Sequence, residues 1–331
     1  MMNGKKVLVV AGPTASGKTA LSLRLAEQLN GEIVSADSMQ IYRGMDIGTA
    51  KATPAEQKKV PHHMLDLLEP GQNYSVSRYV EDASAVCEEL LSHGKLPVIT
   101  GGTGLYIDAL LAGRAFAGTS AAEGGQVSGE PDAGRASSEG LRAALSADFD
   151  RLGAEAMWQR LQAVDPQRAD RLAPTDRRRI IRALEVYELT GRTISEHDAL
   201  SRSLPPAYEA LYVVLDFAER ATLYARIEDR VDRMCRDGLF EETERLLSLG
   251  IPDDSTCMQA IGYRQAAQAL RRELSREDAV LLIKQATRRY AKRQLTWFRR
   301  HREALFLAPD RMTPEELAET AAAAFRGFSH V

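Results

Sequence analysis

Several residue types and patterns that mark particular protein classes are scarce in this sequence of 331 residues. Its three cysteines, Cys87, Cys235 and Cys257, include no CxxC pair, which argues against a disulfide framework or a cysteine zinc site and fits a reducing, cytoplasmic environment. No apolar run approaches the length of a membrane span, and the run at 7–10 lacks the cleavage site of a signal peptide. A formal net charge of −3 argues against a general polybasic surface, so any nucleic-acid partner must be met by local patches.

Predicted strands and helices alternate along much of the chain. Short apolar runs that end in polar or glycine-rich residues predict strands at 7–10, 32–35 and 96–100, and helical periodicity predicts a helix at 76–93. The apolar run at 210–217 predicts a further parallel strand, with helices from there to the C-terminus. This order predicts an α/β fold of the P-loop type, a doubly wound and mostly parallel sheet with ligands at the carboxyl ends of its strands.

The middle of the chain has a different character. A stretch at about 115–140 is rich in Gly, Ser and Ala and has no hydrophobic periodicity, which predicts a flexible segment. The pattern after it is helical up to about residue 200. We therefore expect a P-loop core of residues 1–113 and 203–331, interrupted by a mainly helical domain of residues 114–202.

Residues 12–19, GPTASGKT, match the pattern G-x-x-x-x-G-K-[ST] between a predicted strand and a predicted helix. Backbone N–H groups and the helix dipole of such a loop bind a di- or triphosphate, Lys18 adds a positive charge, and the Thr19 hydroxyl is a ligand for Mg²⁺. The alternative is that the match is accidental and that these residues form a turn without a phosphate site. The residues predicted to bind diphosphate are Gly12, Pro13, Thr14, Ala15, Ser16, Gly17, Lys18 and Thr19, with Thr19 as the predicted magnesium ligand.

The strand at 96–100 does not end in the acidic residue that an NTPase uses to hold magnesium. Asp37 instead follows the strand at 32–35, where its carboxylate could bind magnesium, select a sugar hydroxyl or act as a general base; a turn aspartate remains the alternative. Small-molecule P-loop kinases have an acidic residue at a similar position, so Asp37 alone does not distinguish a kinase from another phosphate-binding enzyme. Arg220 and Arg226 begin a predicted helix near the expected diphosphate, although ion pairs on the helix surface explain them equally well.

Basic residues gather in two segments. Residues 281–302 contain eight Lys or Arg and no acid, with Tyr290, Trp297 and Phe298 between them. Basic residues beside aromatic ones suit RNA loops, but a solvated helix face with its aromatics in the core explains this segment equally well. Two such clusters in a slightly acidic protein favour a nucleic-acid partner. The second cluster consists of Arg177, Arg178, Arg179 and Arg182.

Seven blocks in this order resemble the tRNA dimethylallyltransferase family, also called tRNA isopentenyltransferases. They are GPTASGKTALS, VSADSMQIYRGMDIGTAK, VPHHMLDLLEP, VITGGTGLYI, RRIIRALEVYELTG, MQAIGY and RRYAKRQLTWFRR. The resemblance covers nearly the whole chain apart from the stretch at about 115–140. It implies an enzyme that uses Mg²⁺ to transfer a dimethylallyl group from dimethylallyl diphosphate to N6 of the adenosine 3′ to the anticodon in certain tRNAs, with release of diphosphate.

The resemblance also implies individual roles. Asp37 is the base that takes a proton from the adenine amine, Thr103 positions the reacting groups, and Lys18 stabilises the leaving diphosphate. The inserted helical domain binds the anticodon stem-loop. Arg178 stands where many members have glutamine, and Arg264 and Gln265 stand where lysine and glutamate are common. The implied tRNA contacts are Asp37, Ser38, Met39, Gln40, Thr103, Arg142, Arg178, Arg179, Ile180, Ile181 and Arg182.

Two other functions compete with this prediction. A P-loop small-molecule kinase that uses ATP would leave both basic clusters unexplained, and a non-enzymatic RNA-binding P-loop protein would leave Asp37 and Thr103 without a task. The transferase is therefore the predicted function. No feature of the sequence indicates a membrane contact or an obligate oligomer, so we expect a monomer whose partners are tRNA and dimethylallyl diphosphate.

Overall fold

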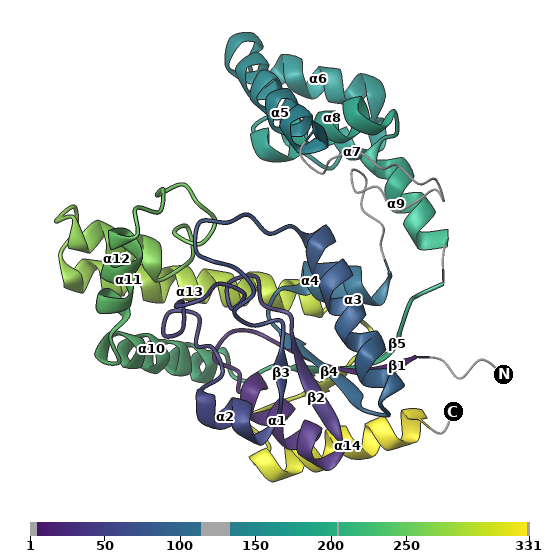
Figure 1. Ribbon diagram of the computed structural model, residues 1–331, viewed down its shortest axis with the longest axis vertical. Coiled ribbons are helices and arrows are strands. Elements are labelled where there is room, and N and C mark those ends of the chain that lie inside the picture. The colour runs from purple at the N-terminus through teal and green to yellow at the C-terminus, as the bar shows by residue number, and fades with distance from the viewer. Residues whose placement is uncertain (1–4, 114–132, 204, 330–331) are drawn as a thin grey trace. The chain divides into compact units, whose positions relative to one another are not determined.

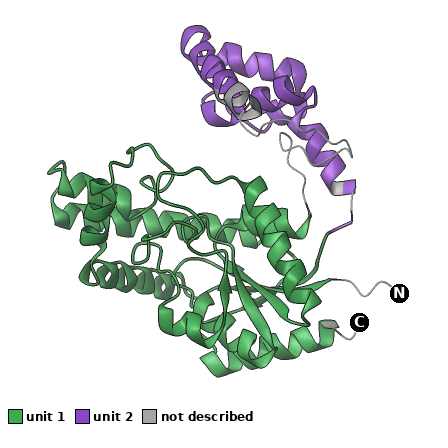
Figure 2. Cartoon of the chain, in the orientation of Figure 1, with its two compact units in different colours: residues 1–113, 207–331 green, residues 114–206 purple. Residues whose placement is uncertain are grey.

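The computed structural model describes residues 5–113, 133–203 and 205–329 (Figure 1). The chain divides into two compact units, residues 1–113 with 207–331 and residues 114–206 (Figure 2). The segment at 203–206 thus falls in the second unit and not, as the sequence suggested, in the first. No described helix is long and apolar enough to cross a membrane.

A parallel sheet of six described strands lies at the centre of the first unit. The strands lie in the order β3-β2-β4-β1-β5-β6, and every neighbouring pair is parallel, which confirms the predicted doubly wound α/β fold. The sequence did not predict β3 and β6, which are short strands at the two edges. The strands are β1 (Lys6–Ala11), β2 (Gly31–Ser35), β3 (His62–His63), β4 (Leu96–Gly101), β5 (Glu209–Leu215) and β6 (Leu305–Leu307).

Helices pack on this sheet because alternate strand residues are apolar on each face. Leu8 and Val10 of β1 belong to one buried cluster with residues of α1 and α14, and these two helices lie together in Figure 1. The described helices of this unit are α1 (Lys18–Gln28), α2 (Pro54–Lys59), α3 (Val76–Ser92), α4 (Gly104–Leu111), α10 (Arg220–Arg236), α11 (Leu239–Ser248), α12 (Tyr263–Leu270), α13 (Arg276–Phe298) and α14 (Pro314–Ser329).

A second buried cluster of the same unit joins the segment after β2 to helices late in the sequence. Ile41 and Met45 pack there with Val231 of α10, Leu239 of α11 and Ile283 of α13. Because Ile41 and Met45 lie in the segment that leaves the carboxyl end of β2, this cluster brings α10 and α13 to that end of the sheet. These helices supply one wall of the cavity described below.

The described part of the second unit consists of helices α5 (Ala133–Leu152), α6 (Ala154–Val164), α7 (Pro166–Ala169), α8 (Arg177–Thr190) and α9 (Ile194–Ser203). Their core contains Leu145, Met157, Leu161 and Leu184. The stretch predicted to be flexible lies partly outside the described residues, and over 133–140 the prediction is wrong because α5 begins at Ala133. Alanine, arginine and glutamate in that segment favour a helix, which the Gly and Ser content obscured.

Candidate active site

The loop between β1 and α1 has a backbone shape that few residues tolerate. Gly12 has φ +144° and a Cβ there would lie 2.8 Å from the carbonyl oxygen of Leu215, so both conformation and space require glycine. Gly17 (φ +95°) and Ala15 (φ +64°) also have positive φ. The loop therefore turns tightly between the strand and the N-terminus of α1, where backbone N–H groups have no partner within the helix and attract anions.

Several side chains of this loop are in positions to bind an anion. Lys18 Nζ donates to the carbonyl oxygen of Pro13 at 2.7 Å, which folds its side chain back over the loop. Ser16 is 2% exposed, and among the described residues its hydroxyl has no hydrogen-bond partner. Thr14 and Thr19 line the adjoining cavity. A ligand oxygen at this loop would give the Ser16 hydroxyl the partner that it lacks.

Two cations lie in the same desolvated space as Asp37. Burial and, to a smaller extent, the positive charge of Arg230 lower the pKa of Lys18 to about 7, against the opposing effect of the Asp37 carboxylate. Burial likewise lowers the pKa of Arg230, again opposed by Asp37. Two cations whose charged forms are disfavoured by burial will bind an anion strongly, because the anion compensates both charges.

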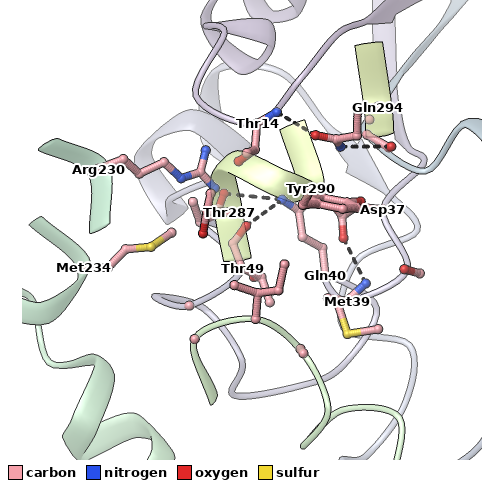
Figure 3. Close-up of a pocket in the computed structure, with 18 of the residues that line it drawn as sticks. Thr14, Asp37, Met39, Gln40, Thr49, Arg230, Met234, Thr287, Tyr290 and Gln294 are labelled. Atoms are coloured by element: carbon pink, nitrogen blue, oxygen red, sulfur yellow. Dashed lines mark hydrogen bonds between the residues drawn. The ribbon is translucent and has the colours of Figure 1, made fainter. Parts of the chain in front are cut away.

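Asp37 follows β2, and its two carboxylate oxygens have different surroundings. Its Oδ1 accepts a hydrogen bond from the Met39 N–H at 2.9 Å, so the turn that was the alternative interpretation is present (Figure 3). Asp37 also lines the cavity, and among the described residues no partner of Oδ2 is found. One carboxylate oxygen is therefore fixed by the turn, while the other is available to a ligand.

Thr103 lies beside Asp37 because the loop after β4 packs on the end of β2. The Thr103 hydroxyl accepts from the Ser38 N–H at 3.2 Å, and the Thr103 N–H donates to the carbonyl oxygen of Ala36 at 3.1 Å. A Cβ on Gly101 would lie 2.2 Å from that same carbonyl oxygen, so glycine is required for this approach. The structure thus brings Thr103 to Ser38, the residue that follows Asp37.

The face of α13 toward the sheet closes the site, which sequence reasoning missed. Gln294 Oε1 accepts from the Thr14 N–H at 2.8 Å, and Nε2 donates to the Gly102 carbonyl at 3.0 Å (Figure 3). Thr287 and Tyr290 line the cavity on the same face. Burial raises the pKa of Tyr290, and its hydrogen bonds to the Thr103 and Gln294 side chains oppose this rise. The spacing of residues 287, 290 and 294 is the signal that could have identified this face.

The aromatic residues of α13 correct one of the two interpretations of its basic segment. Phe298 is fully buried, and the Trp297 indole donates to Asp108 Oδ2 at 2.9 Å. For Phe298 the alternative interpretation, an aromatic residue in the core, is confirmed; Trp297 is half-buried, with the Arg300 guanidinium over its ring at 4.2 Å.

One cavity of about 370 Å³ joins these parts (Figure 3). Its walls come from the phosphate loop, the segments after β2 and β4, and the helices α10 and α13. Ser38, Met39 and Gln40 all line it. The Gln40 amide is also part of the protein framework, since it donates to the carbonyl oxygens of Thr49 and Ala50, both at 3.3 Å.

The wall formed by residues 48–50 is held by a buried acid that sequence reasoning also missed. The Glu242 carboxylate, 1% exposed, accepts from the N–H groups of Asp46, Ile47 and Gly48 at 3.0–3.1 Å and from the Tyr263 hydroxyl at 2.6 Å. A Cβ on Gly48 would meet the Tyr263 ring at 2.5 Å. Nothing local in the sequence links Glu242 to this loop.

The two arginines predicted near the diphosphate occupy different positions. Arg226 Nε donates to the Ala15 carbonyl at 3.0 Å, so it braces the phosphate loop from outside. Arg220 is exposed at the first residue of α10 and does not line the cavity. Arg230, one helical turn beyond Arg226, lines the cavity instead. Its i+4 spacing from Arg226 could have identified it.

Two of the four arginines predicted to contact tRNA in the second unit, Arg142 and Arg182, hold a buried acid. Glu185, fully buried, accepts from Arg142 at 2.8 Å and from Arg182 at 2.9 Å. Arg178 and Arg179 are exposed. The predicted contacts at Ile180 and Ile181 are corrected, because these residues are 0% and 6% exposed and pack in the core of the unit.

Comparisons with known proteins agree with this geometry. The family model described as IPP transferase matches residues 40–301, and the one described as isopentenyl transferase matches residues 5–69. The chain belongs to the IPP transferase family. Curated tRNA dimethylallyltransferases from Caldanaerobacter subterraneus and Geobacter metallireducens are 42% and 44% identical to it, over 95% of both chains and over 91% and 92%, respectively.

Solved structures of IPP transferases extend the comparison. A tRNA isopentenylpyrophosphate transferase from Bacillus halodurans is 36% identical, with a TM-score of 0.68 over 98% of this chain and 96% of the other. A eukaryotic dimethylallyltransferase described as acting on tRNA is 26% identical, with a TM-score of 0.80 over 98% and 79%. The predicted family and fold are confirmed.

Proposed function

We propose that this protein transfers a dimethylallyl group from dimethylallyl diphosphate to N6 of the adenosine 3′ to the anticodon in certain tRNAs. The observation that carries the proposal is that Lys18 and Arg230 share one cavity with Asp37. The cations suit a diphosphate, and the carboxylate suits the removal of a proton from its acceptor. Membership of the IPP transferase family identifies the reaction class.

The acceptor half of the reaction depends on Asp37. The lone pair of an exocyclic adenine amine is delocalised into the purine, so removal of the amine proton as the N6–C1 bond forms accelerates the attack. The Met39 N–H fixes Oδ1 of Asp37, which leaves Oδ2 to accept that proton. Thr103 positions this corner of the site through its hydrogen bond with the Ser38 N–H.

The donor half depends on the phosphate loop. As the C1–O bond breaks, negative charge grows on the diphosphate while the allylic carbon becomes cationic. The N–H groups at the start of α1, Lys18 and Arg230 stabilise that charge, and the burial of the two side chains strengthens the interaction. Arg226 contributes by holding the Ala15 carbonyl and thereby the shape of the loop.

The oxygen ligands of the cavity fit magnesium. Thr19 and Asp37 both line it, and among the described residues no three His, Cys, Asp or Glu side chains form a metal cage. Mg²⁺ prefers such sites, with one or two protein oxygens and the rest from phosphate and water. When bound, the ion neutralises charge on the leaving diphosphate.

For the tRNA we propose the second unit, with Arg142, Arg178, Arg179 and Arg182 as contacts to the phosphate backbone of the anticodon stem-loop. These four arginines are exposed. Splaying the target adenosine out of its loop costs a few kcal/mol, roughly, which such phosphate contacts offset. We also propose that the enzyme acts as a monomer, since no feature of the sequence indicates an obligate oligomer.

The test is transfer of label. Purified protein with Mg²⁺ and dimethylallyl diphosphate labelled in the prenyl group is expected to label a tRNA that has adenosine 3′ to its anticodon. The same tRNA with guanosine there is the matched control and is expected to remain unlabelled. Transfer of phosphate from γ-labelled ATP, to the tRNA or to a small molecule, without prenyl transfer would contradict the proposal and favour the kinase.

A further inference from the structure

The active-site cavity has a neighbour. A second cavity of about 520 Å³ lies beside it in the same unit, and both are lined by Ala50, Arg230 and Met234. The second cavity is otherwise lined mainly by polar and charged residues, among them Lys51 and Arg233. The three shared residues therefore form a partition between two spaces, each of which could hold part of a ligand.

The two sides of the active-site cavity differ in character. The charged residues that line it are Lys18, Asp37, Arg230 and Arg293, and the proposed function puts the diphosphate and the reacting carbon among the first three. Met234 follows Arg230 by one turn of α10, and Figure 3 shows their side chains next to each other at the cavity wall. Val231 of α10 and Ile283 of α13 add apolar surface on that side. A hydrocarbon tail that leaves the charged end of the cavity would pack there.

We propose that Met234 limits the donor to a five-carbon prenyl group by closing the passage from the active-site cavity into the second cavity. The inference rests on the proposed function and adds a determinant of donor length. A dimethylallyl group ends at the Met234 thioether. A ten-carbon geranyl group would have to continue through the position that this side chain occupies.

The reaction itself is the same for both donors. The C1–O bond of the allylic diphosphate breaks, the N6–C1 bond forms, the N6 proton moves to Asp37, and diphosphate leaves. No further reactant is needed, so a change at Met234 alters only which chain fits.

The experiment is a competition between equal concentrations of dimethylallyl and geranyl diphosphate with substrate tRNA, with both modified nucleosides quantified by mass spectrometry. For Met234→Ala we expect the ratio of geranyl to dimethylallyl product to rise about tenfold or more over the unmodified protein, since discrimination by one side chain in an apolar pocket has this size. Met234→Val should shift the ratio in the same direction but less, and it carries the test if the alanine variant does not fold.

The matched control is Met258→Ala. Met258 is 2% exposed and belongs to the same buried cluster against which Met234 packs, yet it lines neither cavity. Its ratio should not change. An unchanged ratio in Met234→Ala, or an equal rise in Met258→Ala, would overturn the inference. Absence of dimethylallyl transfer by the unmodified protein would instead overturn the proposed function, so the two failures are distinguishable.

Discussion

Positive charge is arranged differently in the two units of the chain. In the cavity of the first unit, Lys18 and Arg230 lie in a desolvated space, and among the described residues neither has a carboxylate within 4 Å. In the second unit, Arg142 and Arg182 are exposed and share the buried carboxylate of Glu185. In the part of the chain that the structure describes, the cations of the first arrangement have no anionic partner and favour the binding of an anion. In the second arrangement, the shared carboxylate holds the guanidinium groups in position.

This difference matches two kinds of ligand. Unpaired cations are costly to bury, and a small anion that neutralises them is bound tightly and stabilised as it gains charge. Exposed arginines that keep their carboxylate partner lose little when a phosphate joins them, so they suit a large ligand with many weak contacts. We therefore expect changes in the cavity to have larger effects than changes in the second unit.

The largest effect is expected from Asp37→Ala. Loss of the general base should lower turnover about 1,000-fold while tRNA affinity changes little, because the base acts only as the proton leaves N6. Single-turnover rates and tRNA binding would be measured side by side. Asp229→Ala removes the same charge from an exposed position of α10 and is the control. A normal rate in Asp37→Ala would remove this residue as the base.

Next in size is the loss of Glu242, which would show how far the cavity depends on its supports. Glu242→Gln replaces one acceptor oxygen by a donor that opposes the N–H groups of residues 46–48 and should lower the free energy of unfolding by about 3 kcal/mol. Denaturant titration measures this. Glu241→Gln, at the exposed neighbouring position, should leave stability unchanged; equal stability of both variants would show that the carboxylate does not hold the loop.

The contrast between Asp37 and Glu242 also explains what the sequence could predict. The phosphate loop and Asp37 follow strands directly, so a local pattern places them at one edge of a parallel sheet. Glu242 and Gln294 reach the same site from segments that are distant in sequence, and Gln294 lies 280 residues from Thr14. No local pattern contains such pairings.

Burial within the second unit escaped prediction for a related reason. The family resemblance implies tRNA contacts along the whole segment RRIIR at 178–182, yet consecutive residues of a helix point in different directions. Arg178 and Arg179 are exposed on α8, whereas Ile180 and Ile181 enter the core. Which face of α8 is buried depends on how α5 and α6 pack against it, and no local sequence pattern predicts that packing.

A smaller effect is expected from a change of pH on donor affinity. It tests whether the cavity cations lack an anionic partner before the donor binds. Lys18 has a pKa near 7 in the free protein and must be charged to hold diphosphate. Above pH 7 an increasing fraction of Lys18 is neutral and must take up a proton before the donor binds. The free energy that this costs should lower the affinity for dimethylallyl diphosphate about tenfold from pH 6 to pH 8. Calorimetry without tRNA measures this, and proton uptake should accompany binding at pH 8.

Lys18→Met is the control for this pH dependence, because the diphosphate also titrates. The variant should bind the donor more weakly at every pH and show neither the additional decline above pH 7 nor the proton uptake that Lys18 causes. If the unmodified protein and Lys18→Met have parallel pH profiles, Lys18 is already charged before the donor binds, and the proposed contrast with the second unit is weakened.

The smallest effect is expected at the exposed arginines of the second unit. Arg179 lies 3.4 Å from Asp176, while Arg178 has no acidic partner within 4 Å among the residues that the structure describes. Replacing Arg178 and Arg179 by alanine should weaken tRNA binding severalfold and reduce the slope of log affinity against log salt by about 1.4, since each lost phosphate contact removes about 0.7. Binding would be measured at several salt concentrations.

Turnover at saturating tRNA separates the two units in this last case. The double variant should retain normal turnover, because the exposed arginines contribute to binding and not to the charges that change during the reaction. Lys58→Ala with Lys59→Ala removes two exposed charges from α2 in the first unit and should leave the salt slope unchanged. An unchanged slope in the arginine variant would move the RNA surface elsewhere, and an equal decrease in both variants would mean that net charge, not the position of Arg178 and Arg179, determines tRNA binding.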